Sequence, residues 1–328
     1  MSTATPEAPP VPAVRDGGRV QKRTLRRADR RRRFLRDRSL LLMVIPAVVL
    51  LLIFNYAPMF GTATAFQNYS IYAGFMHSPW SGLETFRSMF ADPLFWQSLE
   101  NTLVLSLVQL LLFFPIPIAL ALLLNSVMNN RVRTIVQSVV YLPHFFSWVL
   151  AVTIFQEMLG GAGALNQALR QHGYATWDIM TNPDAFKFLV TAQVVWKEAG
   201  WGIIVFLAAL AAIDQNLYEA SAVDGAGRWR RMWHITLPGI RSIVVLMLVL
   251  RLGNTLTVGF EQMLIQRGAV GRDASEVLDT YAYYYGVVNA NFSLGAAASL
   301  FKGVLSLILI LAANKIAHLV GEDGLYRK

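Results

Sequence analysis

Six long apolar stretches alternate with polar segments along the chain. A helix needs about 20 apolar residues to cross a bilayer, and each stretch reaches that length. Backbone groups in lipid have to be hydrogen-bonded within their own segment, which favours helices, and the runs are too long and too continuously apolar for barrel strands. The pattern therefore predicts an all-α membrane protein with six transmembrane helices, at approximately residues 39–60, 101–125, 135–159, 187–212, 240–265 and 296–320.

The composition supports a membrane protein. Of the 328 residues, 55% are hydrophobic and only 15% are charged, with a mean hydropathy of +0.44. Soluble domains carry about a quarter charged residues. The chain has no Cys, which excludes a disulfide-stapled secreted module and cysteine-based catalysis.

The basic residues are unevenly distributed and predict an orientation. Residues 1–39 hold 12 of the 29 Lys and Arg residues. With the N-terminus inside, the inner segments carry 20 Lys and Arg, and the outer loops 61–100, 160–186 and 266–295 carry 4. The positive-inside rule then places both termini in the cytoplasm. We interpret residues 1–38 as a basic, disordered cytoplasmic tail that contacts membrane lipid, and we expect no nucleic-acid partner.

A twin-arginine export signal is an alternative interpretation of this basic tail. Arg31 to Arg36 resemble such a signal, and Ala63-Thr64-Ala65 resemble a cleavage site. The following apolar run is as long as a full span, however, and five more spans follow. An uncleaved first helix is therefore the favoured interpretation.

The sequence carries no constellation of catalytic residues. The dipeptide Gly-Lys never occurs, so a P-loop for ATP is absent, and no H-E-x-x-H motif is present. The five His residues are scattered without ligand spacing, so we expect no metal site. A transport role is favoured over a membrane-embedded glycosyl or lipid enzyme. An ion-coupled secondary sugar carrier stays open as an alternative, although the inverted repeats typical of carriers are not evident.

The most informative polar segment is the loop 213–239, between the fourth and fifth apolar stretches. Asp214 is placed to cap a short helix, and Gly225 supplies the left-handed turn that such a helix end prefers. The small side chains at 220–222 allow a close approach to another backbone, and Pro238 suits the first turn of the next helix. The loop has a shape suited to docking in a groove of a partner. An ordinary amphipathic cytoplasmic loop is the alternative.

This loop resembles the motif E-A-A-x(3)-G-x(9)-I-x-L-P of the permease subunits of binding-protein-dependent ABC importers. The resemblance implies a maltose-permease-like fold in the bacterial cytoplasmic membrane. It also implies that the loop helix, including Asp224, is a coupling helix seated in a cleft of a separate cytoplasmic ATP-binding subunit. The spacing of the motif is intact, and Ser221 stands in place of the second alanine. The matching residues are Glu219, Ala220, Gly225, Ile235, Leu237 and Pro238.

Other segments resemble the sugar-importer permeases that handle oligosaccharides and polysaccharide fragments, and the likeness extends roughly over residues 40–325. It implies a permease domain over residues 39–328 that binds no cofactor, with ATP hydrolysed by partner subunits. It further implies a second homologous permease subunit and an extracytoplasmic solute-binding protein that delivers the sugar. The segments concerned are 66–69, 81–86, 196–202, 207–210, 252–254, 259–262 and 279–281.

Polar residues inside the fourth and fifth stretches form a candidate solute path. Ionisable groups at membrane depth usually face the protein interior or a water-filled cavity. Basic and amide groups there are suited to sugar hydroxyls or carboxylates, and Trp rings to sugar faces. The alternative is that Glu261 forms an interhelical ion pair with Arg251 or Lys197. The candidates in the fourth stretch are Trp196, Lys197, Glu198 and Trp201. The candidates in the fifth stretch are Arg251, Asn254, Glu261 and Gln262, which share an arc of roughly 100° if that stretch is one continuous helix.

Prolines within the apolar stretches predict local distortions. Pro115 and Pro117 fall in the second stretch and Pro143 falls in the third. A proline inside a helix removes a backbone donor and commonly kinks it. We therefore expect kinks in these two helices.

Overall fold

The computed structural model describes residues 42–319, so the basic tail predicted for residues 1–38 lies outside the described residues. The chain divides into two compact parts, residues 1–61 and 62–328. In the first part, residues 42–51 are α-helical and continue through a π-helical turn, η1 (Leu52–Tyr56), into α2 (Ala57–Met59). This helix belongs to the first candidate membrane span, Leu42–Phe66.

The second part is built from helices, and its described residues contain no strand beyond an isolated bridge between Gln67 and Trp80. The helices are ordered along the chain as η2 (Phe60–Phe66), α3 (Gly74–His77), α4 (Glu84–Ala91), α5 (Pro93–Phe113), α6 (Pro115–Ser126), α7 (Asn130–Tyr141), η3 (Leu142–Phe145), α8 (Trp148–Leu159), α9 (Ala164–Gln171), α10 (Pro183–Ala211), α11 (Gln215–Val223), α12 (Arg228–Arg231), η4 (Met232–Thr236), α13 (Leu237–Gly253), α14 (Phe260–Val270), α15 (Arg272–Ser275), α16 (Leu278–Tyr283), η5 (Tyr284–Val288) and α17 (Phe292–Leu319).

Six helical segments within the described range are long and apolar enough to cross a membrane. This confirms the predicted all-helical class and the number of apolar helices. The segments are Leu42–Phe66, Pro93–Ser126, Trp148–Gln171, Pro183–Ala211, Arg228–Gly253 and Phe292–Leu319.

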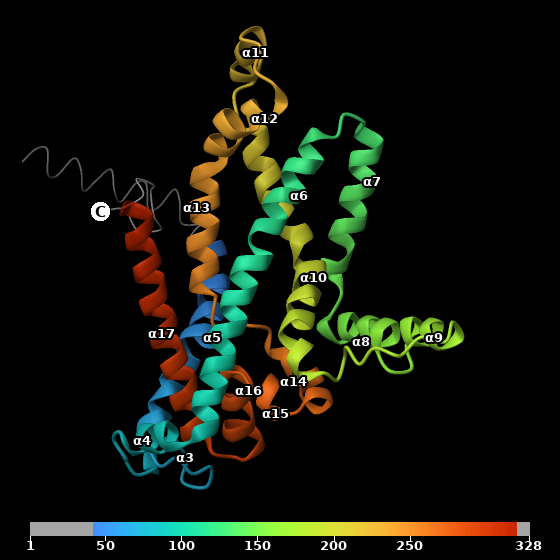
Figure 1. Ribbon diagram of the computed structural model, residues 1–328. Helices are drawn as coiled ribbons and strands as arrows, with labels where there is room; N and C mark the ends of the chain where they lie inside the picture. Colours follow the sequence, from blue (N-terminus) through green and yellow to red (C-terminus); the bar gives the residue numbers. More distant parts are fainter. Residues whose placement is uncertain (1–41, 320–328) are drawn as a thin grey trace, which may run out of the picture. The chain divides into compact units, whose positions relative to one another are not determined.

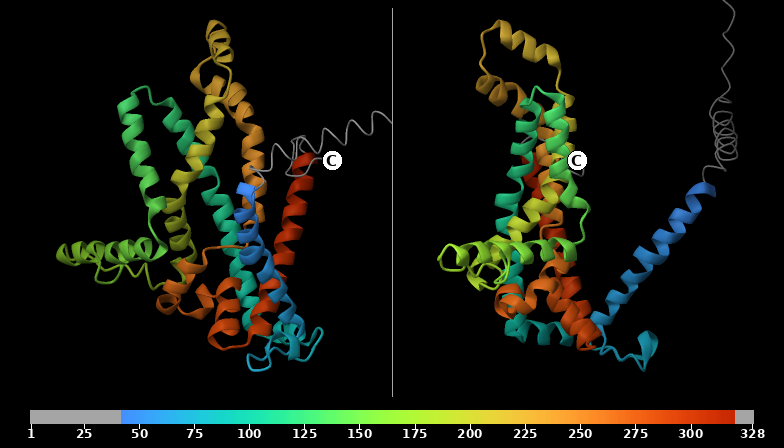
Figure 2. Two further views of the ribbon diagram at one scale, coloured as in Figure 1. Left: turned by 180° about the vertical axis from the view of Figure 1, so that it is seen from behind. Right: turned by 90° about the vertical axis from the view of Figure 1, so that its right-hand side faces the viewer.

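The third apolar stretch is not one helix, so the expected span over 135–159 is wrong. Its first half belongs to α7, which ends at Tyr141, and a short 3-10 turn containing Pro143 follows. Pro143 has no N–H to continue the helix, and Ser147 caps a new helix by accepting a hydrogen bond from the Leu150 N–H. The new helix, α8, lies crosswise to α6, α7 and α10 and leads into α9 (Figures 1 and 2). The predicted kink is a complete break.

The fifth apolar stretch is also interrupted. Helix α13 ends at Gly253, and the next helix, α14, begins at Phe260. Gly259 lies between them with φ of 94°, a left-handed conformation that stops a regular helix. The expectation that Arg251 and Glu261 share one face of a continuous helix is therefore wrong.

Helix α10 is central to the second part. It packs against α5, α6, α7, α8, α13 and η3. At Gly200 the helix contacts the chain of α7 so closely that a Cβ atom would lie 2.3 Å from the Val140 carbonyl oxygen. A glycine is required there because any side chain would force the two helices apart.

The connecting segments gather at two opposite ends of the second part. Helices α11 and α12 lie at one end, and α4, α14 and α15 lie at the other (Figures 1 and 2). The loop 213–239 is thus separated from the predicted outer loops, as alternating membrane crossings require. The assignment of the α11 end to the cytoplasm rests on the charge distribution and stays a prediction.

Candidate functional site

The loop helix α11 has the caps that its sequence predicts. The Asp214 carboxylate accepts a hydrogen bond from the Asn216 N–H at 2.9 Å and so caps the N-terminus. At the other end, Asp224 is followed by Gly225, whose φ is 74°. Glu219 is exposed on this helix. The capped ends therefore present a short, defined helix at the surface.

Two hydrogen bonds join α11 and the turn after it to the helical segment that follows. The hydroxyl groups of Tyr218 and Thr236 lie 2.9 Å apart, and the Arg231 Nε donates to the Ala226 carbonyl at 2.8 Å. A hollow of about 240 Å³ lies between the two helices. Its lining combines acidic and basic groups, among them Asp224, Arg230, Arg231 and His234.

The motif residues of this loop divide into two groups. Glu219, Ala220 and Asp224 are exposed and available to a partner. Ile235 and Leu237 are half-buried and pack against the cluster around Ile240 and Leu210. Ile235 and Leu237 hold the loop to the membrane helices rather than forming part of its free surface.

Pro238 lies in the first turn of α13, as the sequence predicts. Residues Arg228–Gly253 form one continuous helical segment, in which η4 is a π-helical turn between α12 and α13. Proline cannot donate to a carbonyl in the preceding turn, and the wider π turn lies directly before it. Ile235, Leu237 and Pro238 of the motif thus lie within a candidate membrane span.

The candidate residues on α10 form a compact polar cluster with a residue that the sequence analysis missed. The Lys197 ammonium, only 6% exposed, lies 2.8 Å from the Glu198 Oε1 and donates to the His144 carbonyl at 3.2 Å. The His144 Nδ1 lies 2.8 Å from the other Glu198 oxygen. The His144 ring also stacks on Trp201 with ring centroids 4.9 Å apart. The cluster connects α10 to η3, the break after α7.

The two tryptophans of α10 have different environments. Trp201 is 55% exposed. Trp196 is half-buried and makes ring contacts with Phe146 and Phe155. Trp201 has a face free for a ligand, whereas Trp196 is largely occupied by packing.

Arg251 lies near the end of α13 and is half-buried. Its guanidinium donates to the Gln109 Oε1 at 3.3 Å and lies 4.8 Å from the centre of the Phe113 ring. Within the described residues, the expected ion pairs of Glu261 with Arg251 or Lys197 are not formed, because Glu261 lies on the separate helix α14 and is exposed. Asn254 is also exposed, at the α13 end.

Gln262 faces the core rather than an open path. It is fully buried and donates to the Val190 carbonyl at 3.0 Å and to the Gln193 side chain. Gln266 completes a buried glutamine cluster with Gln193. These amides connect α14 to α10. Gln262 therefore contributes to the packing of the two helices and does not line an open solute path.

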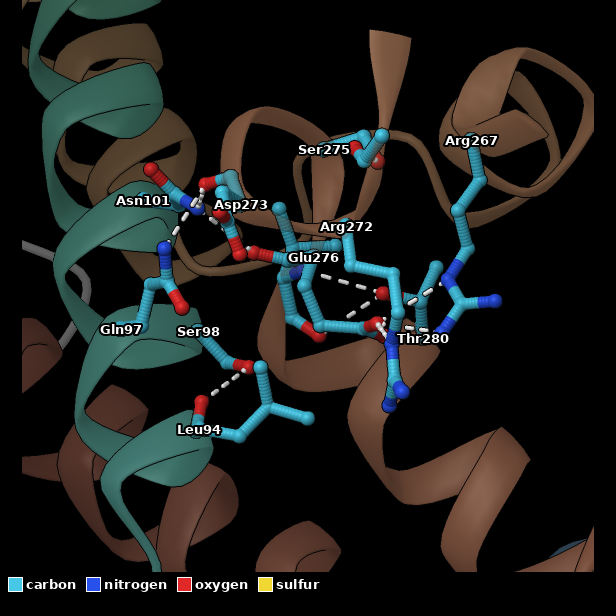
Figure 3. A network of polar contacts seen from close by, with 12 residues as sticks. Leu94, Gln97, Ser98, Asn101, Arg267, Arg272, Asp273, Ser275, Glu276 and Thr280 are labelled. Atoms are coloured by element: carbon cyan, nitrogen blue, oxygen red, sulfur yellow. Dashed lines mark hydrogen bonds and ion pairs between the residues drawn. The ribbon is translucent and has the colours of Figure 1, made fainter. Parts of the chain in front are cut away.

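A second polar network fixes the segment between α14 and α16 (Figure 3). The Glu276 side chain is 1% exposed and lies 2.7 Å from the Arg267 Nη2 and 3.5 Å from the Arg272 Nε. The Asn101 amide of α5 donates to the carbonyls of Asp273 and Glu276. A buried charge requires such partners, so the network determines how this end of the molecule is folded.

The sequence analysis missed the residues whose role depends on contacts between distant segments. His144, Gln193 and Glu276 are polar residues whose partners lie on other elements. Lys302 is different, because a lysine inside the sixth apolar stretch is visible in the sequence alone. It signals a polar site at membrane depth.

The described part of the chain is all-helical, with six candidate membrane spans and an exposed, capped helix, α11, between the fourth and the fifth. The chain belongs to the family of binding-protein-dependent transport system inner membrane components, whose model matches residues 113–321. It is thus a multi-pass subunit of the bacterial plasma membrane, and as a permease it is not itself an ATPase. The alternative of a secondary carrier is excluded by this membership.

Relatives and solved structures agree with the family. The chain is 41% identical over 327 residues to the polygalacturonan/rhamnogalacturonan transport system permease protein YteP of Bacillus subtilis, covering 99% of this chain and 100% of the relative. It is 42% identical to the protein LplB of Bacillus subtilis, covering 89% and 92%. The expected resemblance to permeases of sugar importers is confirmed.

A solved structure shows the same fold. A chain of the bacterial alginate ABC transporter, crystallised in complex with an alginate pentasaccharide-bound periplasmic protein, matches with a TM-score of 0.81 and 35% identity. The match covers 90% of this chain and 99% of that chain. The predicted ABC permease fold is confirmed.

Proposed function

We propose that this permease moves acidic polysaccharide fragments, that is, oligosaccharides containing uronate residues, inward across the cytoplasmic membrane. The observation that carries the proposal is the agreement between two independent matches. Polygalacturonan is named for the relative that aligns over nearly the whole chain, and the acidic polysaccharide alginate is named for the structural neighbour. Both are polymers of sugars that carry carboxylates.

The charges at membrane depth support an acidic solute. Arg251 contacts an amide and an aromatic ring but no carboxylate among the described residues at hydrogen-bond distance. Lys197 is a second cation in this part of the molecule, on α10 within the His144–Glu198 cluster. A guanidinium that is not neutralised by a direct ion pair attracts a carboxylate, which it can bind through two parallel hydrogen bonds.

We also propose that α11 is the coupling helix. The exposed residues Glu219, Ala220, Asp224 and Gly225, with the half-buried Ser221, would sit in a cleft of a cytoplasmic ATP-binding subunit that hydrolyses ATP. A second homologous permease subunit would complete the membrane pathway, and an extracytoplasmic solute-binding protein would deliver the sugar. Coupling requires a contact that differs between two states of the transporter. A small helix with both ends fixed supports such a contact.

The solute assignment is tested by uptake. The chain is reconstituted in liposomes with its second permease, ATP-binding subunit and solute-binding protein, and labelled oligogalacturonate and neutral maltooligosaccharides are offered separately. We expect ATP-dependent accumulation of the oligogalacturonate alone. Accumulation of the neutral sugar alone would contradict an acidic solute while leaving the importer assignment intact.

A further inference from the structure

A cavity of about 530 Å³ lies among α14, α16, η5 and α17, apart from the candidate path residues on α10 and α13. Its volume falls within the range of small-molecule sites. Phe260 and Tyr283 contribute aromatic rings with centroids 5.3 Å apart. The wall also contains an ion pair between the Lys302 Nζ of α17 and the Asp279 Oδ1 of α16, at 2.6 Å.

The ion pair lies at membrane depth. Helix α17 begins at Phe292, and Lys302 follows about 15 Å along it at the usual rise per residue. The whole helix of 28 residues is about 42 Å long, so Lys302 lies inside this candidate membrane span and not at its end. Charged side chains at this depth face the protein interior or a water-filled cavity rather than lipid tails. The cavity is therefore suited to polar contents.

The lining combines two kinds of chemistry. Aromatic rings offer flat apolar faces of the kind that pack against the C–H faces of sugar rings, and their edges tolerate polar neighbours. The Lys302 ammonium is a compact point charge with three rotatable donors, suited to a carboxylate. Both side chains of the pair are partly accessible, at 17% for Lys302 and 21% for Asp279. A carboxylate entering the cavity can therefore reach Lys302.

We infer that this cavity is a saccharide subsite in which Lys302 binds the carboxylate of a uronate residue. Asp279 holds Lys302 in place while the subsite is empty. The Lys302 ammonium has three donors, so it can bind the incoming carboxylate while it stays paired with Asp279, and neither charge of the pair is left isolated. A neutral sugar offers no charge for the free donors. The inference rests on the proposed acidic solute and adds the residue that selects it.

A purely structural ion pair makes different predictions. In that case Lys302 and Asp279 are equally required, and replacing both by apolar residues of similar size preserves function, because buried ion pairs are often replaceable in this way. The subsite instead requires Lys302 much more than Asp279. The two roles are therefore separated by comparing single and double variants.

The experiment measures initial uptake of labelled oligogalacturonate in liposomes containing the complete transporter. With Lys302→Gln we expect uptake at low substrate to fall about tenfold or more, as for loss of a hydrogen bond to a charged group. Lys302→Arg and Asp279→Asn are expected to stay within about threefold of the original rate, because a cation remains in both. ATP hydrolysis stimulated by the loaded binding protein is expected to persist in Lys302→Gln, which a misfolded complex would not show.

The double variant Lys302→Met with Asp279→Leu covers the case in which Asp279→Asn fails to fold. A folded double variant that does not import supports the subsite, and one that imports normally overturns it. Normal uptake by Lys302→Gln, or loss of the second permease from that complex, would also overturn it. If the unaltered transporter imports maltooligosaccharide but no oligogalacturonate, the proposed function itself fails. This outcome is distinct, because it appears before any variant is made.

Discussion

Gly225 shows how one residue sets the shape of the proposed coupling loop. A Cβ atom added at this position would meet nothing within 4 Å, yet φ is 74°. The requirement for glycine is thus conformational and not steric. A left-handed conformation costs other residues roughly 1–2 kcal/mol, and more for β-branched ones, whereas asparagine tolerates it.

We therefore expect Gly225→Val to uncouple transport while the chain still inserts, and Gly225→Asn to retain most of the uptake. The strained valine would displace the end of α11 without altering the membrane helices. The measurement compares uptake with ATP hydrolysis in reconstituted transporter. Glu219→Lys, which changes the charge but not the backbone, serves as a companion. Normal uptake in both Gly225→Val and Glu219→Lys would contradict the coupling role.

Arg251 is the second position where a prediction belongs to a single residue. Its contacts to Gln109 and Phe113 are modest in energy, so Arg251→Ala should leave the complex assembled. Uptake of an acidic oligosaccharide should fall by about tenfold or more, because a charged hydrogen bond is lost. Arg251→Lys keeps the charge and should recover part of the rate. Loss of the assembled complex in Arg251→Ala, seen by size-exclusion chromatography, would show a structural role instead.

At the scale of elements, the seam between η5 and α17 depends on two glycines. A Cβ atom on Gly295 would lie 2.6 Å from the Gly286 Cα, so the two backbones are in direct contact. Gly303 lies on the same helix, and a Cβ atom there would meet nothing within 4 Å. The two positions form a matched pair for testing the seam.

Gly295→Ala should destabilise the purified subunit by about 1–3 kcal/mol through overpacking. Gly303→Ala should be neutral or slightly stabilising, because alanine is the better helix former. Thermal unfolding followed by size-exclusion chromatography distinguishes them. Equal midpoints for the two variants would show that the seam relaxes without cost.

The Glu276 network also acts at this scale, because it holds the loop before α16 in place (Figure 3). The Glu276 carboxylate pairs with Arg267, and the Asn101 amide of α5 donates to the Glu276 carbonyl. Glu276→Gln removes the charge but keeps the shape, leaving Arg267 without its carboxylate partner. Breaking a buried pair typically costs about 3–5 kcal/mol, so the subunit should unfold at a clearly lower temperature. Asp273→Asn is the control, because Asp273 is exposed and its backbone carbonyl accepts the hydrogen bond from Asn101. Similar midpoints for both variants would contradict the argument.

The elements also show where sequence reasoning succeeds and where it stops. Hydrophobic length identifies six apolar helices, because length and polarity are local properties. The caps of α11 were predictable from Asp214 and Gly225 for the same reason. The break at Pro143 and the end of α13 at Gly253 were not predicted, because a proline or a glycine inside an apolar stretch is compatible with either a kink or a break. Partners such as His144 for Glu198 depend on packing between helices that no local pattern records.

At the scale of the whole molecule, the chain is one subunit of a larger machine. Family membership makes it an ABC permease, and a permease without a P-loop depends on another subunit for ATP hydrolysis. A pull-down of this chain from its native membrane in mild detergent should recover an ATP-binding subunit and a second permease, identified by mass spectrometry. Recovery of the chain alone, still transport-competent after reconstitution, would contradict the proposed assembly.

The π-helical turn η4 affects how the loop that contains α11 is rotated about the axis of the membrane helix that follows it. The helix from Arg228 to Gly253 carries α11 at one end and Arg251 near the other. Each residue of an α-helix turns the chain by about 100°, so one residue fewer in Met232–Thr236 would leave a helix but rotate the loop about its axis by that amount. Glu219 would then face a different direction, which would disturb the proposed contact with the ATP-binding subunit. The orientation of the proposed docking surface is thus set by a count of residues in the turn, and deletion of Met232, Trp233 or His234 would alter it without removing any motif residue.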